Sequence, residues 1–465
     1  MPRPVYLTED IRTIERAEAG AVPPLMERAG AAAAELAASL LSDKGKDVLV
    51  LAGPGNNGGD AKVVERILRE RFFRTSLVEK PEQIPAHKTW HLVVDGLFGI
   101  GLARPVEGAW AQLVDYANAQ ACPVLALDIP SGIASCTGAV LGRAVRATHT
   151  ITFIGLKPGL LTLDGPDHCG ELVVADLGLA PGPGTKRGWV AEPSLFAAAL
   201  KPRPRNFHKG LAGSLAVIGG AAGMTGAALL AGRAALALGA GRVYAGLLEP
   251  LAVDPIAPEL MLRHADDVLG LDLDAAVVGP GLGDGERAAT LLAAVLASDL
   301  PCVLDADALN LIAADPDLRK ACAQRAAETI VTPHPAEAAR LLAETTAKVQ
   351  ADRLGAARVL ASNLNAHAVL KGNGSLCVAR DGHWFVNTSG HPGMASAGMG
   401  DVLAGILGAL LAQGYSGETA LVLGTHLHGC AGDAAAAAGA GPVGLAASEL
   451  IGPARRLWNA WRAAG

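Results

Sequence analysis

The sequence predicts an α/β protein with two domains, each built on a parallel sheet with helices on both faces. Two observations predict it. Apolar, β-rich runs alternate with helical patterns along the whole chain. The strand-like runs are apolar throughout, which is typical of strands buried on both faces. The length of 465 residues suits two domains, and a third would still be compatible with it.

The first half of the chain supplies five strand-like runs. A helical segment precedes them. Residues 7–41 are predicted to form two helices, broken at Pro23 and Pro24 because proline removes a helical hydrogen bond. The segments between several of the strands can hold crossover helices. The strand-like runs are KDVLVLA (46–52), HLVVD (91–95), PVLALD (123–128), TITFIG (150–155) and ELVVADLG (171–178).

The alternation is interrupted and then resumes. LAPGPGTKRG (179–188) is rich in turn residues, and KPRPRNFHKG (201–210) is basic and punctuated by proline. We therefore predict an N-terminal domain over 1–200, with a linker at about 181–205, and a C-terminal domain over 201–465. Six further strand-like runs follow, at 213–220, 242–248, 274–283, 301–307, 329–335 and 367–372.

Composition and charge exclude several classes of partner. The net charge is −6 and no basic block occurs, so we expect neither nucleic acid nor an anionic membrane to bind. The apolar runs all fall short of the roughly 18–20 residues of a membrane span. The N-terminus carries charges from its start and has no apolar core of its own, so we predict no signal peptide.

Seven cysteines are scattered without a CxxC pair. This pattern favours reduced thiols in a cytoplasmic protein over a zinc site or a disulfide framework. Alanine-rich helix faces would let subunits pack closely, and on that ground we expect a homo-oligomer. The same faces also suit an ordinary core.

The stretch GPGNNGGD (53–60) lies between a predicted strand and a helical run. In open parallel sheets, ligands bind beyond the carboxyl ends of the strands, next to helix N-termini. Glycines let a backbone approach a ligand closely, and the asparagine side chains offer carbonyl oxygens. We interpret this stretch as a ligand-binding turn. The alternative is a plain tight turn with a helix cap. The stretch fits neither the Walker A nor the GxGxxG pattern.

Two other predicted strands end in the same way. HLVVD ends at Asp95, and PVLALD ends at Asp128 shortly before Ser131. Together with Asn57 these residues place a group of oxygen ligands at one edge of the sheet, which suits a hard or weakly hydrated monovalent cation better than zinc. Each aspartate alone could instead cap a helix.

With GPGNNGGD, the stretches DGLFGIGLARPVEG, ALDIPSGI and LMERAGAAAA resemble the N-terminal domain of the NAD(P)H-hydrate epimerases, over about residues 6–180. That family interconverts the two epimers of hydrated NADH and NADPH. The resemblance implies a Rossmann-like three-layer αβα domain and potassium ligands at Asn57, Asp95 and Ser131. It also implies acid–base work by Asp128. The residues implied for the hydrated dinucleotide are Asn56, Asn57, Gly58, Gly59, Asp60, Gly99, Ile100, Gly101, Leu102, Ala103, Arg104, Pro105 and Asp128.

The sequence departs from this family pattern at two places. Ala61 replaces the glycine that usually follows GGD, and Cys136 replaces an acidic residue after the PSG loop. Neither position coincides with an implied ligand.

The strongest local signal of the second half is AGMGD (397–401), which opens a long apolar helix. Amide groups at Gly398 to Gly400 would form an anion hole at the start of that helix, where the helix dipole favours negative charge. Asp401 is placed to accept a proton from a hydroxyl that attacks phosphorus. The alternative is an aspartate that only caps its helix.

Other strand ends of the second half carry polar groups. Lys371 follows a strand and enters the loop KGNGS, as expected beside nucleotide phosphates. The motif LDADALN contributes Asp305, Asp307 and Asn310, for which solvation or capping is the alternative. His334 lies between two prolines before a helix, and we interpret it as either a ligand contact or an ordinary surface histidine.

These pieces, with HKGLAGSLAVIGGAAGMTGAALLA (208–231) and GPGLG (279–283), resemble the ADP- or ATP-dependent NAD(P)H-hydrate dehydratases, over about 201–455. That resemblance implies a ribokinase-like αβα domain, with ADP or ATP as co-substrate and Mg²⁺. The departures are Met399, His391, and ASEL (447–450) in place of ASDL. The implied substrate residues are Ala227, Gly283, His334 and the catalytic Asp401, and the implied nucleotide residues are Lys371, Gly372, Asn373, Gly374, Ser375 and Gly400.

The two resemblances together imply a bifunctional metabolite-repair enzyme. Its first domain would epimerise NADHX and NADPHX, and its second would dehydrate the S-form back to NADH or NADPH with ADP, or ATP, as phosphoryl donor. The sequence does not distinguish the two donors or the two substrates. One alternative is a small-molecule kinase of the ribokinase superfamily. Another is an inactive dinucleotide sensor or assembly module.

Overall fold

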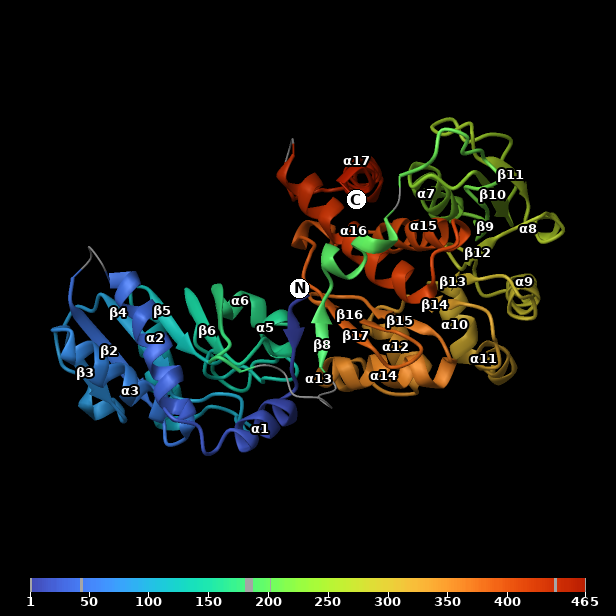
Figure 1. Ribbon diagram of the computed structural model, residues 1–465. Coiled ribbons are helices and arrows are strands. Elements are labelled where there is room, and N and C mark those ends of the chain that lie inside the picture. The colour runs from blue at the N-terminus through green and yellow to red at the C-terminus, as the bar shows by residue number, and fades with distance from the viewer. Residues whose placement is uncertain (1, 42–44, 180–186, 201, 439–440, 465) are drawn as a thin grey trace. The chain divides into compact units, whose positions relative to one another are not determined.

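The computed structural model describes residues 2–41, 45–179, 187–200, 202–438 and 441–464 (Figure 1). The chain forms two compact units, one from Arg3 to Trp189 and one that begins at Val190. This division falls within the predicted linker at 181–205. Of the two predicted linker segments, residues 180–186 and 201 lie outside the described residues. Within the described residues, no helix combines the length and the apolarity that a membrane crossing requires.

The first unit contains a sheet in the order β3-β2-β4-β5-β6-β7, and every neighbouring pair is parallel. A short strand at the start of the unit pairs antiparallel with one at its end. In chain order the elements are β1 (Pro4–Val5), α1 (Thr8–Ala17), α2 (Leu25–Leu41), β2 (Asp47–Ala52), α3 (Asn56–Glu70), β3 (Arg74–Val78), a 3-10 turn (Pro81–Gln83), β4 (Leu92–Gly96), α4 (Gly108–Asn118), β5 (Val124–Leu127), β6 (His149–Phe153), α5 (Pro158–Leu161), α6 (Gly165–Cys169), β7 (Glu171–Ala175) and β8 (Gly188–Val190).

Both faces of this sheet are buried, as predicted from the apolar strands. Val48 and Val50 of β2 pack into one core with α1, α2 and α3, while Leu49 and Leu51 pack into the other core with α4. Successive side chains of a strand point to opposite faces, so a strand that feeds two cores is apolar at every position. The helical break at Pro23 and Pro24 is also present, between α1 and α2.

Five strands of the first sheet, β2, β4, β5, β6 and β7, match the predicted runs. The edge strand β3 was not predicted. Its sequence, RTSLV, is largely exposed or half-buried, and a strand at a sheet edge has no need of a continuous apolar run.

The second unit contains strands in the order β17-β16-β15-β14-β13-β12-β9-β10-β11, parallel from β15 to β11, with β16 and β17 added antiparallel. The elements are two 3-10 turns (Pro193–Leu195 and Ala197–Ala199), β9 (Ser214–Gly219), α7 (Thr225–Ala237), β10 (Arg242–Leu247), β11 (Met261–His264), α8 (Ala265–Val268), β12 (Ala275–Val278), α9 (Glu286–Leu296), β13 (Cys302–Leu304), α10 (Asp307–Ala314), α11 (Pro316–Ala323), β14 (Thr329–Val331), α12 (Pro335–Leu342), α13 (Thr346–Ala351), α14 (Arg353–Leu364), β15 (His367–Leu370), β16 (Ser375–Val378), β17 (Trp384–Asn387), a 3-10 turn (Pro392–Met394), α15 (Met399–Ala412), α16 (Gly417–Ala437), a 3-10 turn (Ala447–Leu450) and α17 (Ile451–Ala464).

The six predicted strands of this unit match β9, β10, β12, β13, β14 and β15. Helix α15 packs against α7 and against α16, and it lies on β9, β12 and β13. A side chain at Gly405 of α15 would overlap the backbone carbonyl oxygen of Ala231 in α7, and one at Gly408 would overlap the side chain of Val277 in β12. Helix α15 is therefore in direct contact with the backbone of α7 and with the side chain of Val277.

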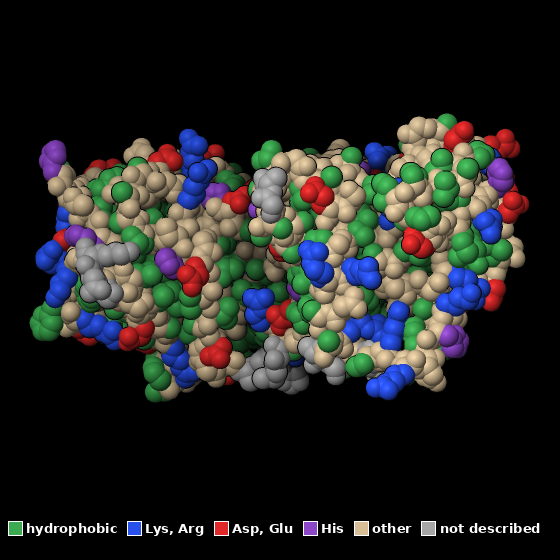
Figure 2. All heavy atoms as spheres, turned by 90° about the horizontal axis from the view of Figure 1, so that it is seen from above, with side chains coloured by type: hydrophobic (Ala, Val, Ile, Leu, Met, Phe, Trp, Pro, Cys, Tyr) green, Lys and Arg blue, Asp and Glu red, His purple; other side chains and the backbone are tan. Residues whose placement is uncertain are grey.

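Acidic and basic side chains are intermingled with apolar ones on the face that Figure 2 shows. This agrees with the mixed charge of the sequence.

Candidate active sites

The turn GPGNNGGD connects β2 to α3, as predicted. Helix α3 begins at Asn56 after an extended Gly55, and no side chain caps it. A side chain at Gly53 would overlap the carbonyl oxygen of Leu97, and one at Gly58 would overlap the carbonyl oxygen of Gly53. These two glycines therefore allow close packing of the backbone against itself, while a side chain at Gly55 would meet open space.

Asp95 and Ser131 form a buried hydrogen-bonded pair at the ends of adjacent strands. The hydroxyl of Ser131 donates to Asp95 Oδ1 at 2.6 Å, and the backbone amide of Ser131 donates to Asp95 Oδ2 at 2.8 Å. Burial raises the pKa of Asp95 to about 6, against the opposing effect of the hydrogen bonds from Ser131 and Leu97.

Asn57 is the third residue of this group. Its side chain is buried, and neither the amide nitrogen nor the amide oxygen has a hydrogen-bond partner in the protein. Buried amides are nearly always satisfied, so both atoms of Asn57 are available to a bound group. A side chain at Gly99 would lie 3.4 Å from the Asn57 Cβ and 3.1 Å from Asp128 Oδ2, so the loop after β4 brings these two polar residues together.

Asp128 has a buried lysine as its partner. Lys157 Nζ donates to Asp128 Oδ1 at 2.5 Å, to Thr152 Oγ1 at 2.8 Å and to the carbonyl oxygen of Phe153 at 2.8 Å. The lysine side chain is fully buried. Asp128 Oδ2 also accepts from the backbone amide of Ile100 at 3.3 Å. The sequence analysis missed Lys157; the signal that could have found it is GLKPG, a glycine-flanked lysine directly after an apolar strand.

A cavity of about 220 Å³ opens next to this group, and two acidic residues of its lining have raised pKa values. Burial, with the nearby charges of Asp128 and Glu15, raises the pKa of Asp60 to about 8. Burial and Asp128 also raise the pKa of Glu15. The lining is Glu15, Glu18, Ala19, Pro24, Leu25, Met26, Ala29, Asn56, Asp60, Phe153, Ile154 and Leu177.

Only the start of the predicted substrate loop, 99–105, contacts Asp128. Gly99 and Ile100 contact Asp128, whereas Gly101, Ala103, Arg104 and Pro105 are exposed at the surface. Leu102 packs at the edge of one core.

The two departures from the family pattern are accommodated by packing. Ala61 is fully buried behind the helix start. Cys136 Sγ lies 3.3 Å from Thr8 Oγ1, beside a 2.7 Å hydrogen bond between Thr8 and Ser135.

In the second unit, Asp401 lies in the first turn of α15. Gly398 precedes the helix with a positive φ of 89°, a conformation that favours glycine. Burial raises the pKa of Asp401 to about 7; Asp305 adds to this shift, and Lys371 opposes it. A carboxylate with a pKa near neutrality is suited to accept a proton at the operating pH.

Lys371 and Asp305 form an ion pair directly beside the start of α15. Lys371 Nζ donates to Asp305 Oδ1 at 2.8 Å and lies 3.9 Å from Glu337 Oε2. A side chain at Gly400 would lie 3.1 Å from Lys371 Nζ, so Gly400 leaves space directly over the pair. Burial alone would lower the pKa of Lys371, but the carboxylates of Asp305, Glu337 and Asp401 outweigh it and raise that pKa.

The loop Lys371–Ser375 folds around a buried arginine. Arg353 Nη2 donates to the carbonyl oxygens of Leu370 and Gly374, each at 3.4 Å, and burial lowers the pKa of Arg353 to about 10. The Ser375 hydroxyl donates to the carbonyl oxygen of Gly372 at 3.0 Å. The sequence analysis did not identify Arg353, which lies in an ordinary helical pattern.

The substrate residues implied for this unit lie on neighbouring loops. The backbone amide of Gly283 donates to Asp307 Oδ2 at 2.8 Å. A side chain at Gly281 would lie 3.3 Å from the Cβ of Ala227, so the GPGLG loop contacts the start of α7. Asn310 Oδ1 instead accepts from Arg340 Nε at 2.9 Å, away from these loops.

His334 caps α12. Its Nδ1 accepts from the backbone amides of Ala336 and Glu337 at 3.1 and 3.3 Å, and Glu337 closes the capping box by accepting from the His334 amide at 2.7 Å. Burial and the charge of Lys371 lower its pKa. The ring is half-exposed, and its Nε2 lies 3.3 Å from Glu337 Oε1.

The departures in this unit also have local explanations. His391 Nδ1 accepts from the Gly393 amide at 3.0 Å, which caps the 3-10 turn after it, as an asparagine side chain could. Met399 is buried. His428 of α16 was not predicted. It is buried near Met399, its Nε2 has no partner in the protein, and burial lowers its pKa to about 4.

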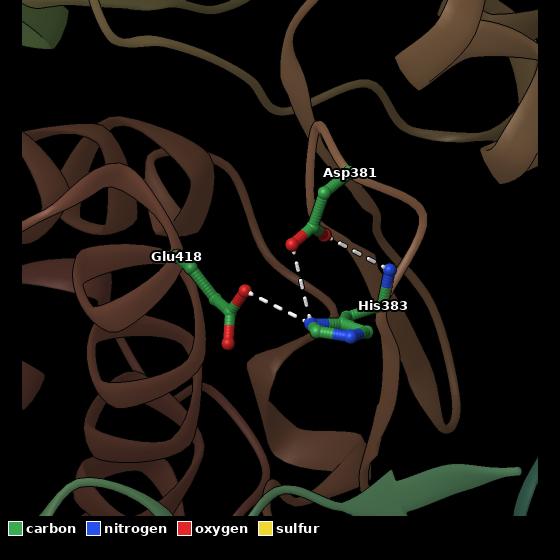
Figure 3. A group of neighbouring side chains, drawn as sticks. All are labelled: Asp381, His383 and Glu418. Atoms are coloured by element: carbon green, nitrogen blue, oxygen red, sulfur yellow. Dashed lines mark hydrogen bonds and ion pairs between the residues drawn. The ribbon is translucent and has the colours of Figure 1, made fainter.

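A third group of side chains lies at the surface, outside these sites. Figure 3 shows His383 between Asp381 and Glu418, with Nδ1 at 3.3 Å from Asp381 Oδ2 and 3.5 Å from Glu418 Oε2. All three are within reach of one metal ion, but Asp381 and His383 are exposed and ion pairs already connect the group. The three side chains therefore form a surface ion-pair cluster.

Comparison with known proteins places both units. Residues 215–452 match the family described as NAD(P)H-hydrate dehydratase, and residues 23–91 and 73–159 match the family described as YjeF-related protein N-terminus. The chain is 38% identical over 504 residues to the "Bifunctional NAD(P)H-hydrate repair enzyme Nnr" of Escherichia coli, covering 99% of this chain and 95% of that protein. The chain belongs to the family of bifunctional NAD(P)H-hydrate repair enzymes.

Two further relatives cover the second unit. An "ADP-dependent (S)-NAD(P)H-hydrate dehydratase" of Neisseria meningitidis is 46% identical over 57% of this chain and 91% of its own length. An ADP/ATP-dependent NAD(P)H-hydrate dehydratase of Bacillus subtilis, co-crystallised with ATP and Mg²⁺, superposes with a TM-score of 0.52 at 29% identity, over 58% of this chain and 98% of its own. These comparisons favour the repair enzyme over the small-molecule kinase and the inactive module.

Proposed function

We propose that the first unit epimerises NADHX and NADPHX and that the second unit dehydrates the S-form, with ADP or ATP as phosphoryl donor. The assignment gives 1–200 to the epimerase and 201–465 to the dehydratase. One observation carries it. Each unit holds one aspartate paired with or beside a buried or half-buried lysine at the carboxyl end of its sheet, Asp128 with Lys157 and Asp401 beside Lys371.

The dehydratase step can be written with the residues of the second unit. The ring hydroxyl of the hydrate attacks the terminal phosphorus of the nucleotide, its proton passes to Asp401, and the nucleotide leaves one phosphate shorter. The carbon–oxygen bond of the phosphorylated ring then breaks, and inorganic phosphate departs. Loss of a proton from the neighbouring carbon restores the double bond. Phosphorylation is needed because hydroxide is a poor leaving group.

The nucleotide and the substrate are assigned to different residues of the second unit. We propose that the loop Lys371–Ser375 and Gly400 hold the nucleotide, since Gly400 leaves space over the ammonium group of Lys371. The amides of Gly398 to Gly400 would stabilise the transferring phosphoryl group. Mg²⁺ would neutralise phosphate charge in the bound nucleotide. Ala227, Gly283 and His334 are the proposed contacts of the hydrated dinucleotide.

In the first unit, Asn57, Asp95 and Ser131 fit a potassium ion. The unsatisfied amide of buried Asn57 supports this, and amide, carboxylate and hydroxyl oxygens are suitable donors for such a cation. Potassium would supply positive charge that holds an oxygen of the dinucleotide. The proposed contacts of that dinucleotide are Asn56 to Asp60, the loop Gly99 to Pro105, and Asp128, which would act as proton acceptor.

We further propose a cytoplasmic enzyme, since each of the seven cysteines is free. We also propose that the protein is a homo-oligomer, on the ground of its alanine-rich helices. Sedimentation at several protein concentrations tests this.

The experiment for the function follows the near-ultraviolet absorbance of reduced nicotinamide while the protein acts on both NADHX epimers, with potassium, magnesium and either ADP or ATP. We expect full recovery of NADH from both epimers, faster than spontaneous epimerisation. Recovery that stops at the share of one epimer would refute the epimerase. A stable phosphorylated product, with no recovered absorbance, would favour the kinase.

A further inference from the structure

The lysine beside Asp128 is an unusual residue for a protein core. Lys157 is 0% exposed, and it donates hydrogen bonds to Asp128, to Thr152 and to the carbonyl oxygen of Phe153. A buried ammonium group loses its hydration, so such a group persists only where it is paired and fully hydrogen-bonded. A leucine or methionine would fill a core more simply. The lysine is therefore explained by its contact with Asp128 and not by packing of the core.

The backbone around this pair is strained at two non-glycine residues. Asp128 has a φ of 64° and Ile154 a φ of 69°. A left-handed conformation is a marked outlier for a β-branched residue such as Ile154, and it persists only where the surrounding structure enforces it. Ile154 lies between Phe153, which accepts from Lys157, and the loop that carries the lysine, and it also lines the cavity. The strain is thus concentrated where the lysine, the aspartate and the cavity meet.

A carboxyl group of α3 lines the cavity beside this pair. Asp60 lies on α3, one turn after Asn57, and lines the cavity together with Asn56, Phe153 and Ile154. With a pKa of about 8 it holds its proton at neutral pH, and the charge of Asp128 contributes to that shift. The groups that act on Asp60 are Glu15 from α1 and Asp128 from the end of β5, with Lys157 acting on Glu15 in turn.

We propose that Asp60 and Asp128 are the proton donor and proton acceptor of the epimerase, and that Lys157 is a positioning residue that holds Asp128 in place. The proposal rests on the proposed function of the first unit. Asp60 holds its proton beside the cavity, and the buried ammonium group of Lys157 is paired with Asp128. One of the two carboxyl groups can therefore donate a proton while the other accepts one.

The pair suits a ring-opening route. Water adds to an enamine so that the hydroxyl ends on the carbon bonded to nitrogen, and this carbon is the inverted centre. Asp128 takes the hydroxyl proton while the carbon–nitrogen bond breaks, the carbon becomes an aldehyde, and the ring nitrogen takes the electron pair and the proton of Asp60. Rotation about the adjacent carbon–carbon bond presents the other face of the aldehyde. The two proton transfers then run in reverse and close the inverted ring.

The first test compares Asp60→Asn and Asp128→Asn with Asp167→Asn, an exposed control in the same unit. Epimer interconversion is followed chromatographically, and dehydration of the S-form by the same chain reports an intact second unit. Each site variant should lose epimerase activity by about a hundredfold or more, the usual scale for a general acid or base. The control should retain it. An active wild type with an unaffected Asp60→Asn variant would overturn the acid–base pair, whereas a wild type without epimerase activity would overturn the proposed function itself.

The second test uses water enriched in oxygen-18. Ring opening moves the original oxygen into the aldehyde and back, so the inverted epimer should retain its oxygen during early turnover. A route that expels hydroxide and readds water would place oxygen-18 in every inverted molecule. That outcome would overturn the ring opening.

The role of Lys157 is tested separately from its contribution to folding. Thr152→Val removes one partner of the lysine and leaves the Lys157–Asp128 pair, while Lys157→Met removes the pair and Lys157→Arg restores a cation. We expect kcat to fall at least tenfold in Lys157→Met with KM little changed, a partial recovery in Lys157→Arg, and a small effect of Thr152→Val. Equal losses of kcat in the methionine and arginine variants, or a rise in KM that matches the fall in kcat, would refute a positioning role.

Discussion

Replacing Asp401 should stabilise the second unit while removing dehydratase activity. The carboxyl of Asp401 has a pKa of about 7 in the folded protein and an ordinary value of 3.8. Between these values the folded protein holds a proton that the unfolded chain has released. Since more protons are bound in the folded state, the free energy of unfolding falls as the pH rises through this window.

The size of the effect follows from the same two values. They differ by about three pH units, and at about 1.4 kcal/mol per unit the cost of an ionised Asp401 approaches 4 kcal/mol above pH 7. Asn at 401 carries no charge at any pH. Asp401→Asn should therefore raise the free energy of unfolding by up to about 4 kcal/mol at pH 8 and by much less near pH 4.

The assay is urea unfolding of the full chain without nucleotide, at pH 4.5 and pH 8, for wild type, Asp401→Asn and the exposed control Asp317→Asn of α11. Because two units can unfold separately, the transition that shifts identifies the one that carries Asp401. A variant that is no more stable than wild type at pH 8, or that gains as much at the lower pH, would falsify the view that burial makes this carboxylate costly.

Three further perturbations follow from the contacts at the two sites. Asn57→Ala should abolish the acceleration of epimerisation by potassium, read from rates at increasing potassium concentration; an unchanged response would contradict the proposed ligand. His334→Ala should cost the second unit about 1 kcal/mol by removing the cap of α12, whereas His334→Asn should restore it, as chemical unfolding would show. Arg353→Met should loosen the loop Lys371–Ser375 and raise KM for the nucleotide several-fold, with the pH profile of kcat unchanged; a loss confined to kcat would argue against a role in that loop.

The central strands were predictable because burial on both faces leaves a continuous apolar run, as in β2 and β4. The edge strand β3 was not, because one exposed side lets polar residues such as Arg74 enter the run. The polar ends of strands also predicted several of the candidate site residues, since the carboxyl ends of parallel strands meet at one edge of the sheet. Asp95 and Ser131, far apart in sequence, are in fact hydrogen-bonded there.

Residues that act through another side chain were harder to predict. Lys157, Arg353 and His428 lie in apolar or ordinary helical surroundings, and only the folded chain shows what each one meets. The sequence equally could not show that His334 serves as a helix cap, because a histidine between two prolines is compatible with several roles.

The close contact of α15 with its neighbours affects how the second unit responds to substitutions. Gly405 brings the helix onto the backbone of α7, and Gly408 brings it onto the side chain of Val277 in β12. A layer of flexible side chains could absorb a small displacement, whereas the backbone contact with α7 transmits it along the helix. An added methyl group at Gly405, one turn from Asp401, would therefore shift the carboxylate relative to the Lys371–Asp305 pair. The position of Asp401 is thus set by the core of the unit, so a substitution in that core also changes the candidate site.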